Sequence, residues 1–183
     1  MHELRNWGMR VGILVVGVFL GLALYLSLSI SKTEAAEEKK GDPAAGEKLF
    51  FDTQGLGALA CVNCHKVNGK GADVGPDLSH VGQKPVEYLR ESIVKPSAYI
   101  VPGYEILSIK MKDGKTMDGL KKGETDKELK IMDITDPDLK IQTVQKDQIE
   151  SITPQPDSFM FSFEKILKED QLNNIIAYLQ TLK

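Results

Sequence analysis

Residues 61–65 have the sequence Cys-Val-Asn-Cys-His, and this short motif limits what the chain can fold around more than any other feature. It contains the only two cysteines of the 183 residues, and His65 follows the second cysteine directly. A C-x-x-C pair serves as a redox dithiol or as half of a zinc site, whereas C-x-x-C-H is typical of covalent haem attachment. Other features of the sequence are needed to choose among these three uses of the motif.

The first two chemistries find little support elsewhere in the sequence. A structural zinc site needs four ligands, which outside the N-terminal tail would have to be Cys61, Cys64, His65 and His80. Such a site is conceivable, but the adjacent Cys64 and His65 would rarely both bind one ion tetrahedrally. A thioredoxin-like dithiol would follow a strand in a βαβ unit, and no strand pattern precedes Cys61. In the third chemistry, the two thiols add to the vinyl groups of a haem and His65 ligates its iron. The motif therefore favours haem attachment.

Composition is that of an ordinary globular protein. A chain of 183 residues with 42% apolar and 27% charged residues predicts one ordered domain. The net charge of -3 argues against a nucleic-acid binder, which normally has a basic face. Two cysteines are too few for a disulfide framework.

A run of 20 uncharged residues, Val11–Ile30, departs from this average. As a helix it would span about 30 Å, the thickness of a bilayer core. The alternative is a cleaved signal peptide, but the run is longer than a typical signal-peptide core, so we expect an uncleaved transmembrane anchor. Residues 1–10 would then form a tail and 31–41 a linker. Basic residues lie on both sides of the run, so the positive-inside rule does not fix its orientation.

The domain that follows, 42–183, begins and ends with helical patterns. Asp42 and Pro43 are typical of a helix start, and residues 84–96 have apolar positions at helical spacing between two prolines. The last 16 residues predict an amphipathic helix, whose apolar face consists of Leu172, Ile175, Ile176, Leu179 and Leu182.

Between these helices, residues 104–152 change to a period of two. Leu107, Ile109 and Met111 alternate with polar residues, and Asp113-Gly114 is typical of a hairpin turn. Alternation returns at 129–131 and at 139–141. The pattern predicts a small antiparallel meander inserted into a helical domain.

Four motifs occur in the order found in class I cytochromes c: AGEKLF (45–50), CVNCHK (61–66), GPDL (75–78) and IIAYLQTL (175–182). From about residue 43 to the end, the chain resembles that family. It is more closely similar to bacterial monohaem domains that have a β-rich insertion before the methionine loop and share Pro96, Ser97, Ala98, Ile100, Gly103 and Tyr104. We therefore expect a mainly α fold: a cytochrome c fold of short helices around one haem, with a small β insertion and an N-terminal transmembrane helix.

The resemblance implies a role for each residue around the motif. Cys61 and Cys64 would hold one haem c through thioethers, and His65 would be the proximal iron ligand. The carbonyl of Pro76 would accept the Nδ1 hydrogen of His65, which fixes the ring and raises its basicity. Leu78 would pack near the haem.

The resemblance also implies that Met160, in the loop before the last helix, is the distal iron ligand. It lies 95 residues after His65, and removing the 49 residues of 104–152 leaves 46, a reasonable span for a compact cytochrome. The rival ligand is His80, which would lower the reduction potential relative to methionine. The remaining candidates belong to the meander and are better explained as packing residues: Met111, Met117 and Met132.

With both axial positions filled, such an iron suits one-electron transfer. We expect a membrane-anchored electron carrier, or a subunit of an oxidoreductase complex, rather than an enzyme. Its partners would be a quinol-oxidising complex and a terminal oxidase, reductase or photosynthetic reaction centre. Because haem c is attached outside the cytoplasm, the domain would be periplasmic, with a single pass through the bacterial cytoplasmic membrane and a cytoplasmic N-terminus. The alternative is a haem enzyme or gas or redox sensor with an open sixth position.

Overall fold

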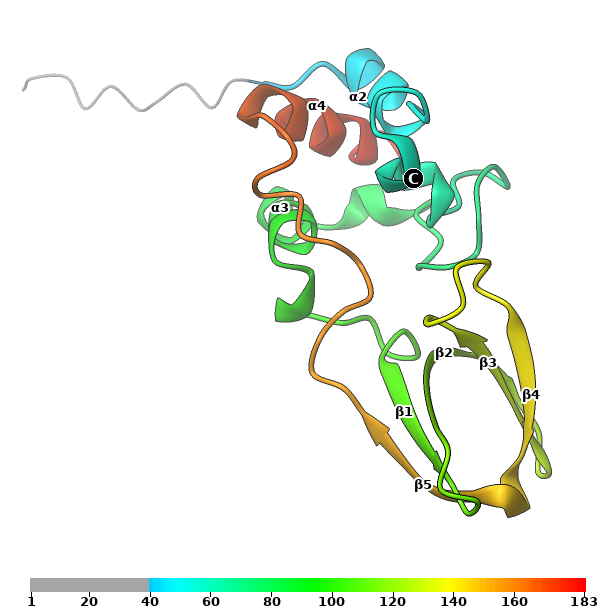
Figure 1. Cartoon of the computed structure of the whole chain (residues 1–183). Helices are drawn as coiled ribbons and strands as arrows, with labels where there is room; N and C mark the ends of the chain where they lie inside the picture. The colour runs from blue at the N-terminus through cyan, green and yellow to red at the C-terminus, as the bar shows by residue number, and fades with distance from the viewer. Residues whose placement is uncertain (1–39) are drawn as a thin grey trace, which may run out of the picture. The chain divides into compact units, whose positions relative to one another are not determined.

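Three α-helices surround the segment that contains the C-x-x-C-H motif (Figure 1). The structure is a computed structural model and describes residues 40–183. Helix α2 spans Pro43–Phe50, α3 spans Val86–Val94 and α4 spans Glu169–Leu179. Short 3-10 turns connect them, at Gly57–Leu59, Cys61–Asn63, Val81–Gln83 and Pro96–Ala98.

Helices α2 and α4 pack closely against each other, although they come from opposite ends of the domain. The carboxylate of Asp42 caps α2 by accepting a hydrogen bond from the Ala44 N–H, at 2.9 Å. The rings of Phe50 and Tyr178 lie 5.6 Å apart between the two helices. Gly46 allows this approach, because a Cβ there would lie 1.9 Å from the carbonyl oxygen of Asn174.

The apolar face predicted for the last helix forms the centre of the helical core. Its five predicted positions are all buried, and they belong to one cluster with residues from α2, α3 and the methionine loop: Phe50, Val67, Leu89, Ile93, Phe163, Leu172, Ile175, Ile176, Tyr178, Leu179 and Leu182. This cluster contacts the cysteine motif through the partly buried Cys61. The helices therefore position the first cysteine.

Five strands form one antiparallel sheet between α3 and α4. They are β1 (Ile106–Met111), β2 (Thr116–Glu124), β3 (Glu128–Asp133), β4 (Ile141–Gln145) and β5 (Ile149–Pro154). Their order is β4-β3-β2-β1-β5, with a 3-10 turn at Lys146–Gln148 between the two edge strands. Gly114 makes the β1–β2 turn at a φ of +87°, in the left-handed region that favours glycine.

The sheet is strongly curved (Figure 1) and has a hydrophobic core of its own. Ile109, Leu129 and Ile131 are almost completely buried in it. A separate cluster joins the sheet to the cysteine motif, where Leu120 of β2 and Met132 of β3 pack with Val74 and against Cys64. The sheet therefore positions the second cysteine, as the helices position the first.

The expectation of a mainly α fold is wrong. In residues 40–183 there are three short α-helices and a five-stranded sheet, so helix and sheet are both major parts of the fold. The sequence predicts only a small meander, and the pattern of its second strand, β2, is weak around Met117. Its partners β1 and β3 pair along both of its sides and extend it to nine residues, which its own sequence does not indicate.

The expected location as a single-pass protein of the bacterial cytoplasmic membrane also needs correction. Within residues 40–183, no helix is long and apolar enough to cross a membrane. The longest, α4, has 11 residues and measures about 16 Å, half of what a bilayer core requires. The segments predicted as tail, anchor and linker, 1–10, 11–30 and most of 31–41, lie outside the described residues, and no membrane location is assigned.

Candidate functional site

The cysteine motif forms a tight turn that places its three functional side chains on one cavity. The 3-10 turn at Cys61–Asn63 is followed by a hydrogen bond that the His65 N–H donates to the Cys61 carbonyl, at 2.8 Å. Residues 72–76, which we call the strap, cross over this turn. The N–H groups of Val74 and Gly75 both donate to the Cys64 carbonyl, at 3.1 and 2.8 Å. Backbone hydrogen bonds thus hold the motif in place.

The ring of His65 is fixed by one hydrogen bond, with 2.8 Å between its Nδ1 and the carbonyl oxygen of Pro76. A carbonyl can only accept, so Nδ1 carries the proton and Nε2 retains a free lone pair. Burial lowers the pKa of His65, and the hydrogen bond to Pro76 offsets this only in part. At neutral pH the imidazole is therefore uncharged, the form that binds metals.

Gly75 leaves room for this ring. A Cβ at position 75 would lie 2.6 Å from Cε1 and 2.9 Å from Nδ1 of His65, closer than real Cβ atoms approach other atoms. The glycine of the GPDL motif is thus required by the packing of the histidine. Leu78, at the end of that motif, is anchored by its N–H to the Lys66 carbonyl, at 2.8 Å.

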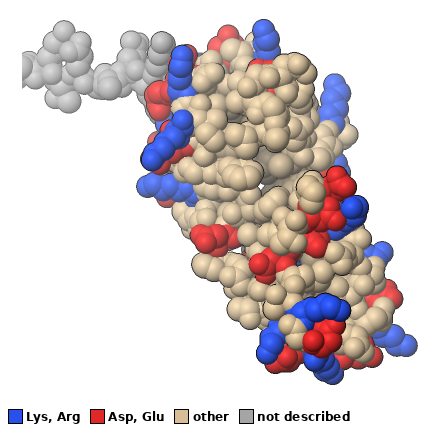
Figure 2. Space-filling model, viewed as in Figure 1, with Lys and Arg blue, Asp and Glu red and all other residues tan. Residues whose placement is uncertain are grey.

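A cavity of about 410 Å³ opens over these residues. Its walls are mostly apolar and come from the motif, the strap, α3, the methionine loop and β2; they include Cys61, Cys64, His65, Pro76, Leu78, Leu89, Ile93, Leu120, Phe159, Met160 and Phe163. Figure 2 shows a hollow on this face, surrounded mainly by uncharged side chains, while charged side chains gather at the periphery. The volume lies within the range of about 300–1,000 Å³ that is usual for cofactor sites.

Met160 lines the cavity and is partly buried against the helical cluster. Its loop is held by hydrogen bonds: the Met160 N–H donates to the Ser158 hydroxyl at 3.1 Å, and the Ser158 N–H donates to the Ser97 hydroxyl at 3.0 Å. Beyond it, Ser162 donates to the Val94 carbonyl at 2.6 Å. These bonds restrain the loop around Met160.

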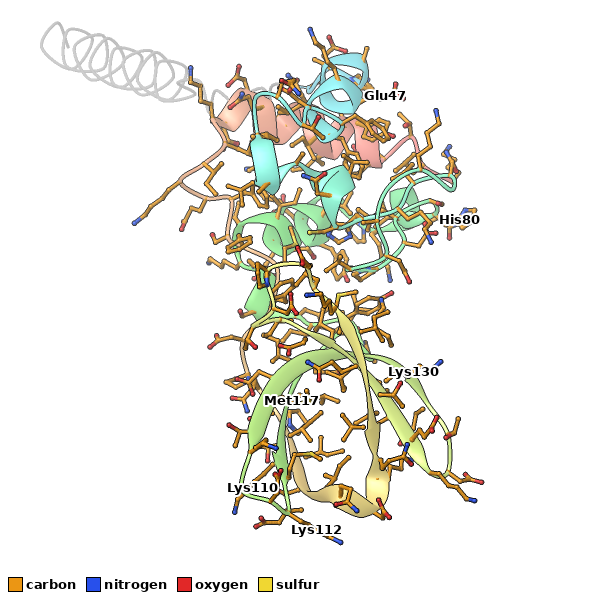
Figure 3. All side chains as sticks on the ribbon, turned by 45° about the vertical axis from the view of Figure 1, so that its right-hand side comes forward. Glu47, His80, Lys110, Lys112, Met117 and Lys130 are labelled. Atoms are coloured by element: carbon orange, nitrogen blue, oxygen red, sulfur yellow. The ribbon has the colours of Figure 1, made fainter. Side chains whose placement is uncertain are left out.

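The rival ligands lie in less suitable places. His80 is exposed at the rim of the cavity, and Figure 3 shows its side chain pointing away from the molecule. His80 follows, by four residues, Pro76 of the strap, whose carbonyl holds His65. Met111 and Met117 pack against the sheet's own core, and Met132 packs with Val74 and Leu120.

The family model for cytochrome c matches residues 43–136, about half of the chain, including the whole C-x-x-C-H motif. The chain belongs to the cytochrome c family. No curated protein matched it. Membership establishes a haem-binding cytochrome of a family that transfers electrons, and its cofactor is covalently attached haem c. The match ends at residue 136, so it does not cover Met160.

The residues of this cytochrome fit haem c. Cys61, Cys64 and His65 line one apolar cavity, and Gly75 leaves the space that the imidazole ring needs. Burial raises the pKa of Cys61 to about 11 and also raises that of Cys64, so both sulfurs are protonated before attachment. Among residues 40–183, no group of three or more His, Cys, Asp or Glu side chains is arranged to hold a metal ion, so the zinc alternative gains no support.

Sequence reasoning missed the contribution of the sheet to this site. Leu120 lines the cavity from β2, and Tyr104 lines it just before β1. Tyr104 was named only as part of the family resemblance, without a role at the site. Leu120 carries no signal in the sequence, because only the pairing of β2 with β1 and β3 brings it to the cavity. Phe159, next to Met160, was likewise not singled out.

Proposed function

We propose that this chain is a monohaem cytochrome of the bacterial class I type, which carries single electrons on an iron ligated by His65 and Met160. The observation that carries the proposal is that both residues line the same apolar cavity as Cys61 and Cys64. When bound, haem c supplies an iron that alternates between its ferrous and ferric states. An iron with both axial positions filled has no free site for a substrate, which favours electron transfer over catalysis.

The side chains of the site hold and orient the cofactor. Cys61 and Cys64 provide the two thioether links, and His65 presents Nε2 because Pro76 retains the proton on Nδ1. The apolar walls exclude water and lower the local dielectric, which together with axial methionine tunes the reduction potential. The protein thus contributes position and environment, and the redox change belongs to the cofactor.

We further propose that the electron donors and acceptors are proteins, such as a quinol-oxidising complex on one side and a terminal oxidase, reductase or photosynthetic reaction centre on the other. Two aromatic residues that line the cavity, Tyr99 and Phe161, are 57% and 60% exposed. They offer an uncharged surface next to the cofactor where a partner can approach it.

Met160→Ala tests the axial ligand. We expect the variant to attach one haem per chain, measured as the pyridine haemochrome, but to lose the methionine–iron charge-transfer absorbance of the oxidised protein. Its reduction potential should fall, because methionine ligation raises it. Two controls should keep both properties: Met117→Ala, which alters a methionine of the sheet core, and His80→Ala, which removes the rival ligand.

Two results would contradict the proposal. If Met160→Ala keeps a low-spin spectrum and an unchanged potential, Met160 is not the ligand. If the oxidised wild-type protein is high-spin and binds small ligands readily, the site is open, as in a haem enzyme or sensor.

A further inference from the structure

Strand β2 contains a β-bulge next to the cofactor cavity. Lys121 pairs with Ile131 of β3, but the next pair joins Gly123 to Lys130, so Lys122 is the extra residue without a partner. Bulges increase the local twist of a strand and redirect a side chain, and they are frequent beside functional sites. Here the bulge lies two residues after Leu120, which lines the cavity.

The redirected side chain of Lys122 reaches the strap, which holds the motif. Its Nζ donates to the backbone carbonyl of Asp73 and lies 3.4 Å from the Asp73 carboxylate. It also lies 6.0 Å from the centre of the Tyr104 ring, within range of a cation–π interaction. Only 14% of the Lys122 side chain is exposed, whereas the Asp73 side chain is 63% exposed, so the lysine is shielded from water but the carboxylate is not.

The contacted residue sits in the middle of the strap. Ala72 donates to the Val62 carbonyl at 3.0 Å, Val74 and Gly75 donate to the Cys64 carbonyl, and Pro76 accepts from His65. Within residues 40–183, no backbone N–H donates to the carbonyl of Asp73, and Lys122 is the group that satisfies it. The sheet is therefore fastened to the segment that orients the imidazole.

We propose that Lys122 is a positioning residue for His65: it clamps β2 onto the strap and so maintains the hydrogen bond from His65 Nδ1 to Pro76. This inference rests on the proposed function, because it takes His65 as the axial ligand. A firmly held hydrogen bond makes the imidazole more basic and stabilises the ferric state. Loosening the clamp therefore raises the reduction potential. Removing the positive charge of Lys122, without any loosening, lowers it.

The experiment uses full-chain holoproteins. Its variants distinguish the effect of losing a charge from the effect of loosening the strap. Asp73→Asn/Lys122→Met removes the lysine donor and both charges of the contact, and leaves the net charge unchanged. In this double variant, we expect amide exchange at Val74 and Gly75 to be about tenfold faster than in the wild type. We also expect the reduction equilibrium to shift about threefold toward the ferrous form, which is about 28 mV at 59 mV per tenfold change.

Two further variants serve as controls. Lys122→Arg keeps a long cationic donor and should retain the wild-type exchange rates and potential. Lys121→Met alters the neighbouring lysine, which is exposed and pairs with Glu124 at 3.2 Å, and should change neither. The amide of Gly46 in α2 should exchange at the same rate in every variant, which separates local loosening from global unfolding.

The results distinguish this inference from the proposed function. A double variant with wild-type exchange and potential overturns the role of Lys122, while the methionine–iron absorbance of the wild type still supports the ligand set. If Lys122→Met lowers the potential and the double variant restores it, Lys122 acts by charge alone and the positioning role is wrong. A wild-type protein without that absorbance contradicts the proposed function itself.

Discussion

At the scale of single residues, the site depends on what surrounds one imidazole. His65 is partly buried, uncharged and held by the carbonyl of Pro76, while Gly75 supplies the space beside its ring. The hydrogen bond keeps the proton on Nδ1, so the lone pair of Nε2 stays free to bind a metal. The residues that flank the histidine are thus as important for the site as the histidine itself.

Gly75→Ala tests this steric requirement. The added Cβ would lie 2.6 Å from the ring, so His65 or the strap has to move and the hydrogen bond to Pro76 has to lengthen. We expect a lower yield of haem-loaded protein and a higher reduction potential in the fraction that is loaded. The overpacking should lower the free energy of unfolding by about 1–3 kcal/mol.

Absorbance measures the yield of haem-loaded protein, redox titration measures the reduction potential, and denaturation measures the free energy of unfolding. Gly123→Ala is the matched control, because its Cβ would meet only Lys130, at 3.7 Å, an ordinary van der Waals distance. A Gly75→Ala protein with wild-type loading and potential would show that the strap adapts without disturbing the ring.

At the scale of elements, the domain depends on two helices that are distant in the sequence. The Asp42 N–H donates to the side chain of Asn174, at 2.8 Å, and the backbone of Gly46 lies directly against that of Asn174. This contact closes the chain around the motif, since α2 precedes it and α4 ends the domain. The first turn of α2 is capped and its last turn buries Phe50, so both ends of the helix are fixed.

Gly46→Ala should separate these helices. The Cβ would approach the Asn174 carbonyl oxygen to 1.9 Å and Tyr178 Cβ to 2.8 Å, and backbone atoms cannot rotate away. We expect a loss of about 2–3 kcal/mol in the free energy of unfolding, typical of overpacking. The higher helix propensity of alanine, about 1 kcal/mol, offsets only part of this.

Denaturant unfolding of the holoprotein measures the change. Lys48→Ala, at an exposed position of the same helix, should stay within about 0.5 kcal/mol of the wild type. Equal stability of Gly46→Ala and Lys48→Ala would mean that the helices tolerate a wider spacing.

At the scale of the whole described chain, two hydrophobic cores share one compact unit. The helical cluster and the sheet cluster have no residue in common, and a third cluster combines Val74 of the strap with Leu120 and Met132 of the sheet. The basic residues Lys110 and Lys112 lie at the end of the sheet that is farthest from the helices (Figure 3). The sheet thus contacts the site with one end and presents charges at the other.

Separate cores predict separate unfolding. Ile131→Ala, in the sheet core, should cost about 2–5 kcal/mol and should unfold the sheet at a denaturant concentration where the methionine–iron absorbance persists. Ile175→Ala, in the helical core, should make circular dichroism and absorbance change together. If Ile131→Ala shows a single transition by both probes, the two cores unfold as one cooperative unit.

The cysteine motif, its histidine and the amphipathic last helix were determined by sequence alone, because each is a local pattern with a fixed spacing. The same holds for the presence of antiparallel strands in the insertion. The carbonyl of Pro76 was found only through family resemblance, and the hydrogen bond is present in the structure. The ligand role of Met160 stays a prediction.

The tertiary structure alone decided how much of the fold is sheet and where the sheet lies. Strand β2 has a weak pattern of its own and is defined by its two neighbours, since pairing between strands is non-local. The bulge at Lys122 and the burial of Leu120 at the cavity follow from that pairing. A local sequence pattern indicates which residues can form a strand. Whether that strand lines the cavity depends on contacts between distant parts of the chain.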